Sequence, residues 1–222
     1  MEIPVIRQVL ESNEQGAEEL RVLFRRHGVL VLNIISSPGS GKTCLLEQTL
    51  HDLGREFRMA VVEGDIQTDN DARRIAATGA SAVQINTNGG CHLDSDLVTK
   101  AVAHLNVASL DILFIENVGN LVCPVEYDCG EDAVVAMLSV AEGDDKPEKY
   151  PSLFEKAQLL LVNKTDLLPY VDFSMETATR HARRLNPHLP VLPISCRKHE
   201  GLDAWYDWLR SGVQKKHASA RA

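Results

Sequence analysis

The stretch Ser36-Ser37-Pro38-Gly39-Ser40-Gly41-Lys42-Thr43 decides the fold class of this chain. It follows residues 29–35, a nearly continuous apolar run that is typical of a buried parallel strand, and precedes residues 45–53, whose apolar positions have helical spacing. A glycine-rich turn between a strand and a helix lets backbone N–H groups converge on phosphate oxygens, and the helix N-terminus adds favourable charge. We therefore predict a phosphate-binding loop.

The residue types in this loop have separate expected roles. Lys42 is expected to contact the β- and γ-phosphate oxygens, and the Thr43 hydroxyl is expected to ligate Mg²⁺. Ser36 replaces the usual first glycine, which we expect to matter little because that position mainly permits a tight exit from the strand. Cys44 lies on the helix after the loop, and its side chain is expected to pack there. The predicted nucleotide-binding positions of the loop are Gly39, Ser40, Gly41, Lys42, Thr43 and Cys44.

A second group of residues predicts guanine as the base. Asn163, Lys164 and Asp166 follow the apolar run 159–162, and an aspartate here can accept hydrogen bonds from N1–H and the exocyclic amine of guanine. Adenine has no matching donors, so a buried carboxylate would be left unpaired by ATP. Ser195 and Cys196 end the next apolar run and are expected to offer a backbone amide to the guanine carbonyl. The sequence therefore favours GTP and GDP over ATP.

Two carboxylates are predicted near the phosphates. Asp65 and Glu116 each close a strand-like run, so both belong at the carboxyl edge of a parallel sheet, where such sheets bind ligands. We predict that Thr43, Asp65 and Glu116 hold Mg²⁺, that Lys42, Asp65 and Glu116 are catalytic, and that the Gly119 amide senses the γ-phosphate. We identify no water-positioning glutamine or arginine finger, so slow turnover on the order of 10⁻⁴ to 10⁻² per second is expected.

Composition limits the protein class. The 222 residues are 44% hydrophobic, and 31 acidic against 23 basic residues give a net charge of -8, which argues against nucleic acid as the main partner. The first residues have no basic and apolar pattern of a signal peptide, and the longest apolar run is too short to span a bilayer. Five widely spaced cysteines favour reduced thiols, and we expect no membrane association and a cytoplasmic location.

Apolar runs alternate with helical patterns along the chain. This alternation predicts an α/β protein with the P-loop NTPase fold, a mostly parallel sheet and helices on both faces. We expect an N-terminal helical extension, 1–28, made of two short helices broken near Asn13 and Glu14, and a GTPase domain, 29–222. The charged stretch 142–149 is expected to be an exposed loop. The predicted strands are 29–35, 59–62, 82–85, 110–115, 133–140, 159–162 and 191–194, and the later predicted helices are 69–78, 94–105, 174–185 and a last one from 202.

Cysteine and histidine residues follow two of these strands. Cys91 and His92 lie in the loop after 82–85, and Cys123 lies seven residues beyond Glu116. Two thiolates and one imidazole form a ligand set suited to zinc or nickel. Free cysteines are commonly buried for packing, so from the residues alone a purely structural role stays open.

Taken together, the motifs resemble one family. Glu63-Gly-Asp65, Cys91-His-Leu-Asp94, Glu116-Asn-Val-Gly-Asn-Leu-Val-Cys-Pro124 and Glu142-Gly-Asp-Asp-Lys-Pro-Glu-Lys-Tyr-Pro151 occur in this order with the phosphate and base loops. From about residue 5 to 211 the chain closely resembles the HypB family of hydrogenase maturation GTPases.

The resemblance implies a function for the cysteine-containing loops. In that family the corresponding positions form the metal site of the GTPase domain, which carries over to Cys91, His92 and Cys123 with Ni²⁺ or Zn²⁺. It also implies GTP-dependent homodimerisation and nickel delivery to the large subunit of a [NiFe]-hydrogenase, with a HypA-type metallochaperone as partner. This chain has neither the cysteine-rich N-terminal nickel motif nor the histidine-rich tract of many members, so we do not expect nickel storage.

Other interpretations stay open at this point. A GTP-dependent switch with structural cysteines would bind partners without its own metal. A urease-type nickel maturation GTPase is less favoured, because that family usually has Glu-Ser-Gly-Gly in place of Glu116-Asn-Val-Gly119 and a Cys-Pro-His metal motif. A P-loop kinase is disfavoured by the guanine-binding residues. Cys129 is not assigned as a ligand.

Overall fold

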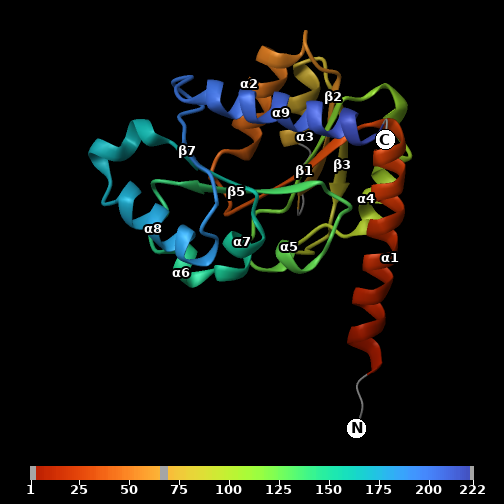
Figure 1. Cartoon of the computed structure of the whole chain (residues 1–222), viewed down its shortest axis with the longest axis horizontal. Coiled ribbons are helices and arrows are strands. Elements are labelled where there is room, and N and C mark those ends of the chain that lie inside the picture. The colour runs from red at the N-terminus through yellow and green to blue at the C-terminus, as the bar shows by residue number, and fades with distance from the viewer. Residues whose placement is uncertain (1–3, 66–69, 221–222) are drawn as a thin grey trace.

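A seven-stranded sheet forms the centre of the computed structural model, which describes residues 4–65 and 70–220 (Figure 1). The strand order is β3-β2-β4-β1-β5-β6-β7, and every pairing between these strands is parallel, which confirms the predicted fold class. The strands are β1 (Leu30–Ser36), β2 (Met59–Asp65), β3 (Ser81–Asn86), β4 (Ile112–Glu116), β5 (Ala133–Ser139), β6 (Leu159–Asn163) and β7 (Val191–Pro193).

Helices cover both faces of the sheet (Figure 1). On one face α2, α3 and α9 pack on the strands, with Trp205 of α9 fully buried there. On the other face α1 and α4 cover one half of the sheet, and α7 and α8 cover the other half. The α-helices are α1 (Pro4–His27), α2 (Lys42–Leu53), α3 (Asn70–Ala77), α4 (Ser95–Val102), α5 (Cys123–Glu126), α6 (Lys146–Lys149), α7 (Pro151–Lys156), α8 (Met175–Leu185) and α9 (Leu202–Ala220), and the 3-10 helices are η1 (Val107–Ser109) and η2 (Thr165–Tyr170).

The central strands are buried on both faces. Every residue of β1, β4 and β6 is buried, which explains why their sequences are apolar runs rather than alternating patterns. Since parallel strands end at the same edge, the loops after β1, β2, β3 and β4 meet there. No helix within residues 4–65 and 70–220 has the length and apolar character needed to cross a bilayer.

The predicted break in the N-terminal helical segment is wrong. α1 is one continuous helix of 24 residues, and it packs its buried Ala17, Leu20 and Phe24 against the sheet and α4. Asn13, the expected breaker, is buried, and its side chain bonds to groups outside the helix instead of competing with the helical backbone. Residues 1–3 of the predicted segment lie outside the described residues.

Other differences are local. The predicted loop 142–149 contains the short helix α6, whose Pro147 is buried. The predicted helix 94–105 ends at Val102, and Asp94 is its N-cap, accepting a hydrogen bond from the Leu97 N–H at 2.8 Å. Strand β2 continues beyond the predicted residue 62 to Asp65. The predicted start of the third helix at Asp69 lies outside the described residues.

Candidate functional site

The phosphate loop has the backbone geometry that its glycines allow. Gly39 has φ of 76° and Gly41 has φ of 103°, a region that L side chains rarely adopt. A Cβ on Gly41 would lie 2.5 Å from Asn163 Nδ2, so this position also requires a glycine for space. Lys42 Nζ donates to Ser36 Oγ at 3.0 Å, which shows that the serine replacing the usual glycine supports the lysine.

The predicted Gly119 lies directly against this loop. A Cβ on Gly119 would approach the backbone N and Cα of Pro38 to 3.0 Å. The close approach places the segment after β4 beside the phosphate loop. A cavity of about 350 Å³ opens between them, and Asp65 and Arg74 also line it.

Acidic side chains converge on this cavity. Thr43 Oγ1 donates to Glu116 Oε1 at 2.9 Å, as expected for two predicted magnesium ligands. Carboxylate oxygens of Glu63, Asp71 and Glu116 all lie within 4.8 Å of one another. Asp65 ends β2 and lines the same cavity, although it is not a member of that group.

Glu63 and Asp71 were missed by the sequence analysis. Residues Glu63 and Glu116 are paired across β2 and β4, which makes the two carboxyls neighbours. Strands β2 and β4 both carry acidic residues at their carboxyl ends, and this pattern could have indicated that Glu63 lies near Glu116. No pattern in the sequence indicates that Asp71 of α3 lies near these two carboxyl groups.

Burial changes the protonation of the two strand-end carboxyls. Glu63 and Glu116 are 2% and 3% exposed. Burial and the neighbouring Glu116 raise the pKa of Glu63 to about 11, and burial likewise raises the pKa of Glu116. Glu63 Oε2 and Glu116 Oε2 are buried with no hydrogen-bond partner in the part of the chain that the structure describes. Such oxygens suit a hard cation such as Mg²⁺, so the residues present fit that ion.

The predicted base-binding residues are tied to the phosphate loop. Asn163 Nδ2 donates to the Ser40 carbonyl at 2.9 Å, and Asn163 Oδ1 accepts from the Cys196 N–H at 3.1 Å. Ser195 Oγ donates to Asp166 Oδ1 at 2.6 Å, which orients the carboxylate. The structure therefore joins both halves of the predicted nucleotide site.

Lys164 adds a further bond to the phosphate loop. Its backbone is left-handed, with φ of 63°, and its Nζ donates to the Gly39 carbonyl at 2.6 Å. Behind these loops the Cys44 thiol contacts Cys196, and this hydrogen bond lowers the pKa of Cys44 to about 7. Cys44, in the first turn of helix α2, therefore packs against the base-binding loop.

The structure also brings the two cysteine-containing loops together. A hydrogen bond with Cys123 raises the pKa of the Cys91 thiol, and Cys91 Sγ lies 3.7 Å from His92 Nδ1. His92 stacks on Tyr127 with ring centroids 3.7 Å apart, and burial lowers the pKa of His92, which favours the neutral imidazole that binds metals. The donor atoms of Cys91, His92 and Cys123 do not all lie within 4.8 Å of one another in this single chain.

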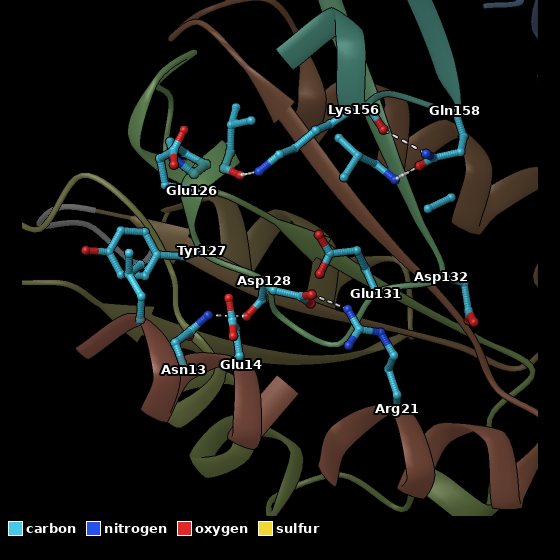
Figure 2. Close-up of a pocket in the computed structure, with 15 residues that line it drawn as sticks. Asn13, Glu14, Arg21, Glu126, Tyr127, Asp128, Glu131, Asp132, Lys156 and Gln158 are labelled. Atoms are coloured by element: carbon cyan, nitrogen blue, oxygen red, sulfur yellow. Dashed lines mark hydrogen bonds and ion pairs between the residues drawn. The ribbon is translucent and has the colours of Figure 1, made fainter. Parts of the chain in front are cut away.

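A second cavity, of about 370 Å³, lies between α1 and the segment that follows Cys123 (Figure 2). Asn13 Nδ2 donates to the Asp128 carbonyl at 3.0 Å, and Arg21 forms an ion pair with the Asp128 carboxylate. On the opposite side Lys156 Nζ donates to the Val125 carbonyl at 2.7 Å. These contacts fix the position of the segment after Cys123. The residues that make them, Asn13, Arg21 and Lys156, lie far from that segment in the sequence.

Comparisons with family models, known sequences and solved structures all find HypB-related proteins. Residues 30–193 match the family model described as CobW/HypB/UreG, nucleotide-binding domain. The hydrogenase maturation factor HypB of Azotobacter vinelandii is 53% identical over 90% of this chain, which spans 66% of that protein.

Solved structures agree with this. The crystal structure of HypB from Helicobacter pylori in complex with nickel is similar with a TM-score of 0.88 and 37% identity, covering 92% of this chain and 96% of that one. The hydrogenase maturation factor HypB from Archaeoglobus fulgidus gives a TM-score of 0.86 and 35% identity, covering 91% and 99%.

Proposed function

This chain belongs to the CobW/HypB/UreG family of nucleotide-binding proteins, and from that premise we propose that it is a GTP-hydrolysing metallochaperone that assists nickel insertion into a [NiFe]-hydrogenase. The predicted resemblance to HypB proteins is thereby confirmed. Nickel is the cargo of the proposed reaction, and GTP is its substrate.

The proposed nucleotide chemistry uses the residues of the sheet edge. Lys42 and the backbone of the phosphate loop bind the phosphates, and Asp166 selects guanine. Thr43, Asp65 and Glu116 hold Mg²⁺, with Glu63 close enough to Glu116 to take part. The ion would neutralise charge on the phosphate oxygens. Hydrolysis is expected to be slow without a partner's help.

The proposed metal site consists of Cys91, His92 and Cys123. The observation that carries it is the stack of His92 on Tyr127, with ring centroids 3.7 Å apart, which joins the loop after β3 to the segment that begins with Cys123. Thiolate and imidazole ligands suit Ni²⁺ and Zn²⁺. The nickel complex of the Helicobacter pylori relative supports nickel as the cargo.

The proposal includes partners that the resemblance implies. The protein acts in the cytoplasm as a homodimer that forms with GTP, receives metal with a HypA-type metallochaperone and delivers it to the hydrogenase large subunit. Nucleotide exchange or hydrolysis resets the dimer.

A nickel titration in two nucleotide states tests this function. The protein is titrated with GDP-Mg and then with a non-hydrolysable GTP analogue, with its oligomeric state followed in parallel. We expect nickel affinity or stoichiometry to change with the nucleotide. Cys91→Ser and His92→Ala should abolish the change and leave GTP binding intact.

The exposed His104 supplies a matched control. His104→Ala should behave as the wild type in both titrations. Equal nickel binding in the two nucleotide states, or none, would instead indicate a GTP switch that acts only through its partners.

A further inference from the structure

Leu93 joins the cysteine–histidine loop to the rest of the molecule. It directly follows Cys91 and His92 and is fully buried. Its backbone N–H donates to Asn117 Oδ1 at 3.1 Å, and its carbonyl accepts from the Cys129 thiol at 3.4 Å. Both backbone polar groups of Leu93 are therefore held by side chains from the segment that follows β4.

Asn117 belongs to the segment that is expected to respond to the nucleotide. It comes directly after Glu116, which bonds to Thr43, and it is fully buried. Its Oδ1 also accepts from the Val118 N–H at 3.0 Å. Two backbone donors thus face the same side of the amide, which fixes the orientation of its oxygen and nitrogen.

The nitrogen of the same amide continues the network. Asn117 Nδ2 donates to Asn33 Oδ1 at 3.1 Å, and Asn33 Nδ2 donates to Glu131 Oε1 at 3.2 Å. Glu131 Oε2 accepts from the Cys129 N–H at 2.8 Å, and Cys129 bonds to Leu93. The bonds form a closed ring through five residues from three separate parts of the chain.

The side chain of Leu93 contacts the second acidic strand end. A Cβ on Gly64 would lie 2.8 Å from Leu93 Cγ, so Leu93 packs over the glycine between Glu63 and Asp65. Leu93 therefore contacts the ends of both strands that carry predicted magnesium ligands. It packs on Gly64 at the end of β2, and it bonds to Asn117 directly after β4. A shift of either strand end requires Leu93 to move or to lose a contact.

We propose that Asn117 is a positioning residue that transmits the nucleotide state from the segment 116–119 to the loop of Cys91 and His92 through Leu93. This inference rests on the proposed function, in which that loop supplies nickel ligands. A buried N–H without an acceptor is strongly disfavoured, so the loop follows the Asn117 amide when the γ-phosphate draws the segment 116–119 toward the phosphate loop. Asn117 lines the 350 Å³ cavity, but in this role it acts through its hydrogen bonds to Leu93 and Val118 and is not assigned as a ligand of nickel or nucleotide.

The first test needs no metal. Amide hydrogen exchange of residues 91–95 is measured with GDP-Mg and with a non-hydrolysable GTP analogue. The wild type should show a difference between the two states, Asn117→Ala should lose it, and Asn117→Asp, which keeps the acceptor oxygen, should retain most of it. Circular dichroism and GDP binding establish that each variant is folded.

Asn13 offers a matched control. It also bonds to the cysteine loops, because its Oδ1 accepts from the Ser95 N–H at 2.9 Å and its Nδ2 donates to the Asp128 carbonyl. Within the described residues, none of its side-chain hydrogen bonds involves the segment 116–119. Asn13→Ala should therefore speed exchange near Ser95 in both states and keep the difference between them. Loss of the difference in Asn13→Ala, or its persistence in Asn117→Ala, would overturn the proposal.

Nickel titrations of the same variants complete the test. We expect the ratio of nickel affinities in the two nucleotide states to fall to about one in Asn117→Ala, the value for uncoupled sites, and to keep its wild-type value in Asn13→Ala. A wild-type ratio in Asn117→Ala would also overturn the proposal. If wild-type exchange responds to nucleotide but nickel affinity does not, the proposed function fails and the coupling through Asn117 stands. Identical wild-type exchange in both states overturns the coupling.

Discussion

Two carboxyl groups lie side by side in the interior because of strand register. The parallel pairing of β2 with β4 sets Glu63 beside Glu116, and both are almost completely buried. Ionising both would place like charges together away from water, so we expect the pair to keep at least one proton until a cation neutralises it. We expect this arrangement to make the protein's stability depend on pH and on the proposed Mg²⁺.

Glu63→Gln should flatten this pH dependence. The pKa of Glu63 is raised from 4.5 to about 11, so its protonated form favours the folded state. The free energy of unfolding then falls as pH rises above the unfolded pKa, by at most about 1.4 kcal/mol per pH unit from this group. Urea unfolding between pH 5 and 8 without Mg²⁺ measures the slope. An equal slope in the wild type and in Glu63→Gln would mean that ionisation of Glu63 does not cause the pH dependence of stability.

Asp166→Ala should weaken selection of guanine. The variant loses a charged acceptor for two donors of the base, and we expect GTP affinity to fall at least about 30-fold, which corresponds to ~2 kcal/mol. ATP affinity should hardly change. Competition of GTP and ATP against a fluorescent nucleotide measures the two affinities. An unaltered preference for GTP would mean that Asp166 does not contact the guanine base.

At the scale of elements, α1 is a structural support for the segment that carries Cys123. Asn13 and Arg21 bond to Asp128 (Figure 2). Gly130 packs directly on the helix. A Cβ on Gly130 would lie 2.7 Å from Leu20 Cβ. The N-terminal helix therefore positions one half of the proposed metal site, although it contributes no ligand.

Gly130→Ala should separate α1 from this segment. The residue has φ of +77°, and the added methyl group would collide with the helix, so we expect a loss of about 2–4 kcal/mol in the free energy of unfolding. Gly79 is a matched control, because it has φ of +88° but no atom within 4 Å of an added Cβ. Gly79→Ala should cost only about 1 kcal/mol. Urea unfolding compares the two, and equal losses would contradict the role of packing at Gly130.

At the scale of the whole molecule, the sheet order gathers the site. β1 lies between β4 and β5, so the phosphate loop has the acidic strand ends on one side and the base-binding loops on the other. Asn163 crosses from the base-binding side to the phosphate loop. Binding of a nucleotide would therefore hold both halves of the sheet edge together.

Nucleotide should stabilise the whole fold in proportion to its affinity. With GDP-Mg at 100 times its dissociation constant, the free energy of unfolding should rise by about 2.7 kcal/mol. Lys42→Ala should lose most of this gain at the same ligand concentration. Thermal unfolding with and without GDP-Mg measures the shift, and removal of Mg²⁺ with a chelator should reduce it. A shift of wild-type size in Lys42→Ala would show that the nucleotide binds at another place.

Much of the candidate nucleotide site could be proposed from the sequence because its information is local. The phosphate loop and the residues Asn163, Lys164 and Asp166 follow buried strands directly, and the position of a strand end fixes where the next loop lies. The apolar runs predicted each of the seven strands. For the central strands the reason is that a strand buried on both faces must be apolar, whereas the edge strands β3 and β7 are only partly buried.

The remaining features depend on residues that lie far apart in the sequence. Only the register of β2 and β4 made Glu63 a neighbour of Glu116, and only packing kept α1 continuous through Asn13, whose partners are 82 and 115 residues away. The ring through Leu93 and Asn117 likewise has no sequence pattern, because all of its bonds except the one between Cys129 and Glu131 join residues at least 24 positions apart. The sequence by itself determined the fold class and the nucleotide-binding loops. Tertiary structure alone decided how the buried polar groups are paired, since a buried donor or acceptor takes the partner that the packing of distant segments supplies.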